Sequence, residues 1–317
     1  MASTEPKVRR SFLSVPDLTH ADLERLLTLA AEMKADRGLG RGAPTADALG
    51  GQHVALLFEK PSLRTRCTFE VAIHELGGHT VHLPAQFSEA VREPLEDVAR
   101  NLERWIAALV IRTYRQETAV ACSAAAPRLR VINALSDEHH PCQALADVLT
   151  LREHWGTFRG RTLAYVGDGN NVATSLAQAA TMMGVTVHIA TPAGYELPRG
   201  VTKALTGLTR DGAELRLFTN PREAVAGAHA VYTDVWTSMG QEREAVKRRG
   251  IFADYRVDRT LMAAASPGAL FMHCLPAHRG EEVTAEVLES RASVVFDQAE
   301  NRLHTQKALL AMLLGAP

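Results

Sequence analysis

The chain has 317 residues, of which 46% are hydrophobic and 22% charged, and its formal net charge at pH 7 is −1. These proportions are ordinary for a folded soluble protein, and the length predicts about two domains. A net charge near zero gives no overall field that would recruit nucleic acid or an anionic membrane, so we expect neither partner. No apolar run approaches the ~20 residues that span a bilayer, and residues 1–10 lack a signal-peptide core. The sequence therefore predicts a cytoplasmic protein.

The cysteines and histidines do not form a metal-binding pattern. Cys67, Cys122, Cys142 and Cys274 are widely spaced without a C-x-x-C pair, which is typical of reduced thiols. The 13 histidines include no H-E-x-x-H motif. We therefore expect no dedicated catalytic metal.

Helical and strand patterns alternate along the first half of the chain. In order, they predict a helix over 19–36, a Gly/Pro-rich break over 38–44, a strand over 53–58, a helix that ends before Gly77, a helix over 95–104, a strand over 108–112, a helix over 117–126 and a strand over 129–133. Successive β–α units imply a mainly parallel sheet that is covered on both faces.

The alternation restarts after a long predicted helix over 140–154, so we expect a domain boundary near 144–160. Beyond it the pattern predicts strands over 162–166, 186–190, 230–233, 270–272 and 293–296, a helix over 172–183 and a terminal amphipathic segment over 302–314. The predicted fold class is α/β, with two doubly wound parallel-sheet domains and an active site in the cleft between them. We expect domains over 1–143 and 144–299, the first completed by a C-terminal helix at about 300–317.

The run from Lys60 to Arg66 places three cations and two hydroxyls between an apolar strand and an amphipathic helix. Free N–H groups and the positive end of the helix dipole point at such a turn, and Arg64 or Arg66 can hold two phosphate oxygens at once. Arg112 ends the neighbouring strand. This pattern indicates a site for phosphate or carboxylate, whereas the simpler alternative is a solvated helix start capped by Ser62.

Two more strand-to-helix turns carry polar groups. His140 and Gln143 flank the start of the long helix, where they can donate to a carbonyl or an amide, although a simple cap with a buried Cys142 fits equally well. The run 167–171, GDGNN, is like a dinucleotide turn but has Val172 in place of the third glycine. Its paired amides suit the head group of an amino acid better than NAD.

An acid, a thiol and an imidazole follow the last strands of the second domain. Asp234 begins the run DVWTSMG after one strand, and His273 and Cys274 begin the run HCLP at the end of another. Because ligands of open α/β sheets bind outside the carboxyl ends of the strands, we expect these groups at one edge. The alternative is that Cys274 only packs against the core.

Taken together, these motifs resemble the aspartate/ornithine carbamoyltransferase family over nearly the whole chain. The matching segments are 58–66, 140–147, 167–172, 234–242, 273–282 and 297–305. The resemblance implies transfer of the carbamoyl group of carbamoyl phosphate to the δ-amino group of L-ornithine, giving L-citrulline and phosphate, without a cofactor. The expected setting is arginine metabolism, in the direction of biosynthesis. The SMG and Cys-containing motifs point to an ornithine-like substrate rather than aspartate.

The resemblance also implies roles for individual residues. The carbamoyl phosphate site would comprise Ser62, Leu63, Arg64, Thr65, Gln86, Arg112, His140, Gln143, Cys274, Leu275 and Arg302. The ornithine site would comprise Asn171, Asp234, Ser238 and Met239. The catalytic groups would be Arg64, Arg112 and His140, which stabilise developing charge, and Asp234 with Cys274, which receive or relay a proton.

Leu63 and the loop around Gln86 depart from the common family pattern. Many members have Thr where Leu63 stands, so one hydroxyl donor is missing here. Gln86 would reach the site of a neighbouring subunit, and the resemblance implies a homotrimer or a multiple of trimers. Two alternatives stay open: a carbamoyltransferase for putrescine or an acylated ornithine, and an inactive binding paralogue.

Overall fold

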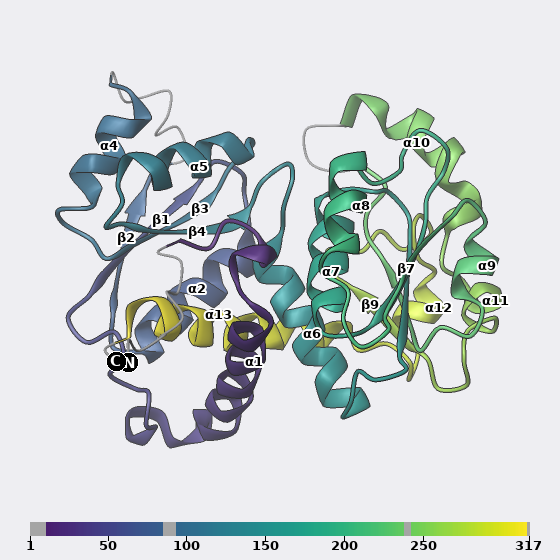
Figure 1. Cartoon of the computed structure of the whole chain (residues 1–317), viewed down its shortest axis with the longest axis horizontal. Helices are drawn as coiled ribbons and strands as arrows, with labels where there is room; N and C mark the ends of the chain where they lie inside the picture. The colour runs from purple at the N-terminus through teal and green to yellow at the C-terminus, as the bar shows by residue number, and fades with distance from the viewer. Residues whose placement is uncertain (1–10, 85–92, 238–241, 316–317) are drawn as a thin grey trace. The chain divides into compact units, whose positions relative to one another are not determined.

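The computed structural model describes residues 11–84, 93–237 and 242–315. The chain divides into two compact units (Figure 1): unit 1 comprises Met1–Leu145 and Arg302–Pro317, and unit 2 comprises Ala146–Asn301. Two helices, α6 (Pro141–Trp155) and α13 (Val295–Leu314), contribute residues to both units. Within the described ranges, no helix combines the length and the hydrophobicity that a membrane crossing requires.

Unit 1 is built on a four-stranded parallel sheet in the order β2-β1-β3-β4. Its strands are β1 (His53–Phe58), β2 (His79–Leu83), β3 (Ala108–Arg112) and β4 (Arg130–Leu135). Its helices are α1 (His20–Ala35), α2 (Leu63–Glu75), α4 (Leu95–Leu102) and α5 (Gln116–Ala125), with short 3-10 turns η1 (Val15–Asp17) and η2 (Asp36–Gly42). Figure 1 shows α4 and α5 on one face of the sheet and α1, α2 and α13 on the other.

Local sequence explains these elements. The strand β1 is a continuous apolar run because both of its faces are covered: Ala55 and Leu57 pack into the core beneath α4 and α5, and the alternate residues Val54 and Leu56 are also buried. The helix α1 begins with a capping box, in which the N–H of Asp22 donates to Thr19 Oγ1 (3.1 Å) and the N–H of Thr19 donates to Asp22 Oδ2 (3.0 Å).

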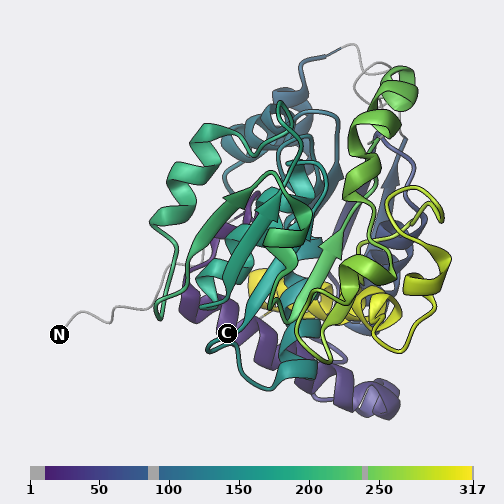
Figure 2. The same ribbon diagram turned by 90° about the vertical axis from the view of Figure 1, so that its right-hand side faces the viewer.

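Unit 2 contains a five-stranded parallel sheet in the order β7-β6-β5-β8-β9, whose strands run in one direction, as the arrows of Figure 2 show. The strands are β5 (Thr162–Val166), β6 (Thr186–Ala190), β7 (Leu215–Phe218), β8 (Ala230–Thr233) and β9 (Leu270–His273). The helices and 3-10 turns are α7 (Asn171–Met182), α8 (Arg199–Thr206), α9 (Pro221–Val225), η3 (Glu242–Glu244), α10 (Ala245–Phe252), η4 (Ala253–Tyr255), α11 (Arg259–Met262) and α12 (Ala285–Leu288).

The two faces of this sheet carry separate cores. In β5, Leu163 and Tyr165 pack beneath α7 and α8, whereas Ala164 and Val166 pack on the side of α9 and α10. This alternation is the period of two that a strand imposes on its side chains. Since both faces are buried, the whole strand is apolar, which is why the sequence pattern identified it.

Each sheet has a point where the direction of strand winding reverses. In unit 1 the reversal lies between the neighbours β1 and β3, and in unit 2 it lies between β5 and β8. At such a point the connections that follow the two adjacent strands leave in opposite directions, which opens a crevice at their carboxyl ends. The runs beginning at Lys60, Gly167 and Asp234 follow three of these four strands, namely β1, β5 and β8.

The observed elements confirm the prediction of two parallel-sheet α/β domains, with one strand wrongly predicted. Residues 293–296 do not form a strand: Ser293 makes an isolated bridge to Phe271, and α13 already begins at Val295. A short apolar run of this kind is compatible with either element. The pattern also does not predict the edge strands β2 and β7, because their residues are mostly half-buried or exposed and lack a clean apolar run.

Gly169 is required where the loop after β5 packs against another backbone segment. A Cβ added there would lie 2.5 Å from the carbonyl carbon of Glu196 and 2.5 Å from the nitrogen of Leu197. We expect Gly169→Ala to lower the free energy of unfolding by about 1–3 kcal/mol through overpacking. The control is Gly200→Ala in α8, where a Cβ meets nothing within 4 Å and Ala favours the helix. Urea unfolding measures both, and equal stability of the two variants would contradict this account.

Candidate active site

The arginine turn of unit 1 lies directly after β1, and α2 begins within it. Ser62 is the N-cap residue of α2, so the first N–H groups of the helix face the carboxyl edge of the sheet. Arg66 is exposed and pairs with Glu70 (2.8 Å), whereas Arg64 is half-buried. Leu63 is 78% exposed. Of the two arginines in the turn, Arg64 is therefore the better candidate to hold an anion.

Arg302 joins three helices of unit 1 through its guanidinium group. It donates from Nη2 to Thr65 Oγ1 in α2 (2.9 Å) and from Nη1 to Gln143 Oε1 in α6 (2.6 Å). Arg302, Thr65 and Gln143 are all buried. Both acceptors are neutral, so these contacts fix the guanidinium without cancelling its positive charge. Three residues predicted from distant parts of the sequence thus meet at one place.

His140 lies in the same positive environment. It is 5% exposed, and burial, Arg302 and Arg112, in that order of importance, hold its pKa well below the usual range for an imidazole. Arg112 is also buried, at the end of β3, where its register partner is Phe58 of β1. A neutral imidazole can donate one N–H bond to an uncharged group, which is what a carbamoyl oxygen requires.

A buried polar network fixes the loop that leads to His140. Ser136 Oγ donates to Gln116 Oε1 (2.6 Å), and Asn133 Nδ2 donates to the same oxygen (3.0 Å). The N–H of Gln116 donates to Asp137 Oδ1 (2.8 Å), and the N–H of His139 donates back to Ser136 Oγ (3.1 Å). This network holds the loop between β4 and α6, so His140 enters α6 from a defined position.

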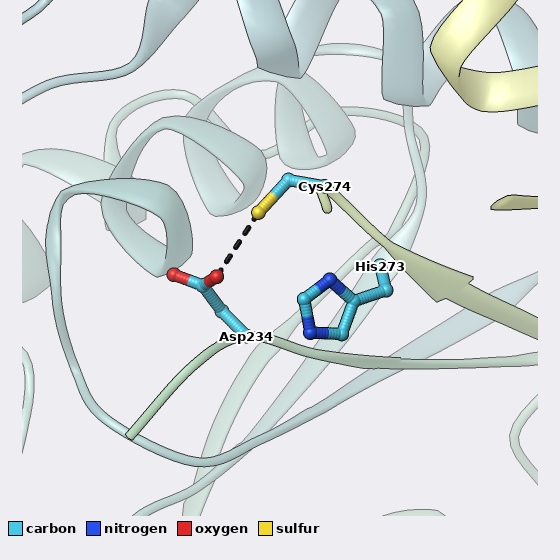
Figure 3. A group of neighbouring side chains, drawn as sticks. All are labelled: Asp234, His273 and Cys274. Atoms are coloured by element: carbon cyan, nitrogen blue, oxygen red, sulfur yellow. Dashed lines mark hydrogen bonds between the residues drawn. The ribbon is translucent and has the colours of Figure 1, made fainter. Parts of the chain in front are cut away.

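In unit 2, Asp234 and Cys274 meet because of the register of two parallel strands. Thr233 of β8 is paired with His273 of β9, so the next residue of each strand lies at the same level. The thiol of Cys274 donates to Asp234 Oδ1 at 3.0 Å, as Figure 3 shows. Asp234 is buried and Cys274 is half-buried. A carboxylate and a protonated thiol are thus in direct contact at the carboxyl edge of the sheet.

Asn170 completes the surroundings of Asp234. Its Nδ2 donates to Asp234 Oδ2 (2.8 Å), while its Oδ1 accepts from the N–H groups of Val172 (3.0 Å) and Ala173 (3.1 Å) as the N-cap of α7. The family resemblance implies the substrate contact at Asn171, which is the first residue of α7. The role of Asn170 was missed because the helix was predicted to begin at 172, so that Asn171 stood directly before it, whereas α7 begins one residue earlier.

Arg248 is a second residue that the sequence argument missed. Its guanidinium, on α10, donates to the carboxylate of Asp168 and to the backbone carbonyl of Trp236, and it lies over the ring of Tyr195 (4.7 Å to the centroid). Burial raises the pKa of the Asp168 carboxyl to about 6, against the opposing effect of Arg248. Arg248 therefore links the loop after β5 to the loop after β8.

Two groups of side chains among the described residues have the spacing that could hold a metal ion: Asp234, His273 and Cys274, and a second group formed by His278, Glu281 and Glu282. In the first group, His273 Nδ1 accepts from the N–H of Leu275 (2.8 Å) and Nε2 lies 3.2 Å from Glu282 Oε1. Both ring nitrogens are thus engaged elsewhere, and this group does not fit a metal site as it stands.

The remaining predicted residues fall into two categories. Leu275 follows Cys274 in unit 2 and has a left-handed backbone conformation (φ 56°). Gln86, Ser238 and Met239 lie outside the described residues.

Two family models together match almost the whole chain. Residues 10–153 match the family model "Aspartate/ornithine carbamoyltransferase, carbamoyl-P binding domain", and residues 159–313 match "Aspartate/ornithine carbamoyltransferase, Asp/Orn binding domain". A curated ornithine carbamoyltransferase of Acidothermus cellulolyticus is 51% identical over 97% of both chains, and that of Thermosynechococcus vestitus is 49% identical over 96% of both.

Solved structures show the same likeness. The ornithine carbamoyltransferase of Pyrococcus furiosus is 45% identical with a TM-score of 0.92 over 98% of both chains. That of Thermus thermophilus is 44% identical with a TM-score of 0.85, covering 96% of this chain and 99% of its own. From its two matching domain models and its nearly full-length relatives, the chain belongs to the aspartate/ornithine carbamoyltransferase family.

Proposed function

We propose that the protein is an ornithine carbamoyltransferase, which converts carbamoyl phosphate and L-ornithine to L-citrulline and phosphate. The observation that carries this proposal is the contact between Cys274 Sγ and Asp234 Oδ1 at 3.0 Å, because these two groups belong to the motifs that distinguish an ornithine site from an aspartate site. The relatives named above support it. They carry the name ornithine carbamoyltransferase, and this chain aligns with nearly their full length.

Carbamoyl phosphate is the electrophile and takes the positive site of unit 1. We assign its phosphate to the start of α2, where the N–H groups after Ser62 and the guanidinium of Arg64 supply charge-assisted hydrogen bonds. Arg112 lies between phosphate and carbamoyl group in this assignment, and Arg302 adds a fixed positive charge. His140 and Gln143 bind the carbamoyl end, with His140 as a neutral donor.

L-ornithine is the nucleophile and takes the edge of unit 2. Asp234 receives its α-amino group: a carboxylate has about four acceptor positions, so the bonds from Asn170 and Cys274 leave capacity for an ammonium donor. The α-carboxylate lies at the start of α7 near Asn171, where the helix dipole favours negative charge. Ser238 and Met239 complete this site in the proposal.

The reacting δ-amine must lose a proton before it attacks. An alkyl ammonium has a pKa near 10.4, so keeping it neutral at pH 7 costs about 4–5 kcal/mol. Attack of the neutral amine on the carbamoyl carbon gives a tetrahedral intermediate, and the C–O bond to phosphate then breaks. In the proposed mechanism, Cys274 and Asp234 relay the proton, while Arg64, Arg112 and His140 stabilise the charge on the carbonyl oxygen and the departing phosphate.

The assembly and setting of the protein are part of the same proposal. Family resemblance supports a homotrimer in which Gln86 serves a neighbouring subunit. It also supports a cytoplasmic enzyme of arginine biosynthesis.

The first prediction concerns the substrate. Purified protein with carbamoyl phosphate should release phosphate and form L-citrulline with L-ornithine, but not carbamoylate putrescine, N-acetylornithine or aspartate at comparable rates. Product formation is followed by chromatography, with each amine tested separately. Turnover with putrescine or N-acetylornithine instead would refute the role of Asp234, and ligand binding without turnover would indicate a binding protein.

The second prediction concerns Arg302. In Arg302→Lys the charge remains, but a lysine cannot reproduce the planar pair of bonds to Thr65 and Gln143. Because a hydrogen bond from a charged donor is worth about 1.5–3 kcal/mol, the KM for carbamoyl phosphate should rise roughly tenfold or more, with a smaller change for L-ornithine. The matched control is Arg100→Lys, at an exposed arginine. An unchanged KM in Arg302→Lys would remove this residue from the site.

The third prediction concerns His140 and pH. Its pKa is lowered in the folded state, so the unfolded state binds more protons below its own value of about 6.5, and the stability falls with decreasing pH. This loss of stability falls mainly between pH 7 and pH 5, because the imidazole of the unfolded chain gains its proton in that interval. We expect His140→Gln to lose less stability over that interval than the unaltered protein, measured by urea unfolding at each pH. An identical pH dependence in His140→Gln would contradict a neutral, buried imidazole.

A further inference from the structure

His273 is a buried histidine whose two ring nitrogens have different and defined roles. It is the last residue of β9 and is 0% exposed. Its Nδ1 lies 2.8 Å from the backbone nitrogen of Leu275, which can only donate, so Nδ1 must be the acceptor. The proton of the neutral ring is then on Nε2, which points at Glu282 Oε1 at 3.2 Å. The surroundings thus select one tautomer.

Glu282 is fixed independently of the ring. Its side chain is 0% exposed, and its Oε1 also accepts from the backbone N–H of His278. Its carbonyl accepts from the N–H of Val257 (2.8 Å), and the N–H of His273 itself donates to Gln298 Oε1 (3.0 Å). Both ends of the pair formed by His273 and Glu282 are therefore anchored in the core of unit 2.

The group that this pair holds is the backbone immediately after Cys274. Leu275 has a φ of 56°, a conformation that non-glycine residues rarely adopt, and its N–H is bonded to His273. On the other side, the thiol of Cys274 is bonded to Asp234. Figure 3 shows the thiol facing Asp234, with the ring of His273 beside them. Cys274 is thus held between a side-chain anchor and a backbone anchor.

We propose that His273, oriented by Glu282, is a positioning residue that holds the N–H of Leu275 and thereby sets the position of the Cys274 thiol and of the Cys274–Leu275 backbone. The effect that we expect on turnover rests on the proposed function. The effect that we expect on the Cys274 thiol does not depend on that function. The competing account is that His273 is a buried residue that contributes only to stability. In the positioning account, the contact of Nδ1 with the N–H of Leu275 determines the position of Cys274. In the competing account, neither ring nitrogen has a special effect on Cys274.

Two substitutions separate the two halves of the ring. In His273→Asn, the side-chain oxygen can replace Nδ1 as the acceptor for Leu275, and the bond to Glu282 is lost. In His273→Gln, the longer amide can reach Glu282 in place of Nε2, and the acceptor for Leu275 is lost. Both are made in a Cys67→Ser background, because Cys67 is exposed whereas Cys122 and Cys142 are buried. Thermal melts then report the stability of each variant.

We expect kcat to differ between the two variants by more than the difference in their stabilities explains. His273→Gln should lower kcat for L-ornithine by about 10- to 100-fold, because misplacement of a reacting group by about 1 Å costs up to about 10²-fold, while His273→Asn should stay within about threefold of the parent. Equal kcat values for the two variants would overturn the positioning role. If the parent itself makes no L-citrulline, the proposed function fails, and the next two measurements still decide the role of His273.

Alkylation of Cys274 by iodoacetamide tests the thiol directly. The rate should change in His273→Gln by about tenfold and remain near the parent value in His273→Asn. Equal rates in the two variants would again overturn the proposal.

The tautomer is measured in the parent protein, so the test survives if either variant does not fold. In protein labelled with ¹⁵N-histidine, the ring adjacent to the Leu275 amide proton should show a protonated Nε2 and an unprotonated Nδ1. A proton on Nδ1 would overturn the proposal.

Discussion

The reversal of strand winding in each sheet is the constraint on which the site depends. In both units the chain starts its sheet near the middle, extends it to one side, and then returns to extend it on the other side. The loops after the two central neighbours therefore diverge, which leaves their first residues free to carry polar side chains instead of packing against each other. Arg112, the last residue of β3, and Asp234, the first residue after β8, are the charged residues at this point of each unit.

Charge and burial then divide the chemistry between the units. In unit 1 the guanidinium of Arg302 is held by a hydroxyl and an amide, and burial, followed by the charges of Arg302 and Arg112, lowers the pKa of His140. In unit 2 the carboxylate of Asp234 is held by an amide and a thiol. Each site thus keeps a charge of one sign through contacts with neutral groups, which suits an anionic electrophile in one unit and a cationic amine in the other.

The sequence predicted the fold wherever both faces of an element are buried, because burial on both sides produces an apolar run that can be recognised without knowing the neighbours. It did not predict β2 and β7, since these edge strands are half-buried or exposed and keep polar residues, unlike the mostly buried edge strands β4 and β9. It predicted a strand at 293–296 where α13 begins. The charged residues of the candidate site could also be picked out from the sequence, because cations and acids placed directly after strands have few structural explanations. The residues that hold these charged groups in place could not be predicted from the sequence. Arg248, for example, lies 80 residues from Asp168 in the chain, and only the tertiary structure brings the two together.

The bond between Arg248 and the carbonyl of Trp236 has a consequence for changes of length in the segment between them. These residues are 12 positions apart, and their contact closes a loop whose two ends are fixed by a single buried side chain. The entropy of closing a loop grows slowly with its length, by about 0.6 kcal/mol for each doubling. A change of length between the two ends therefore alters the closure entropy little, and the residues that the proposal assigns to L-ornithine, Ser238 and Met239, belong to this interval of the sequence.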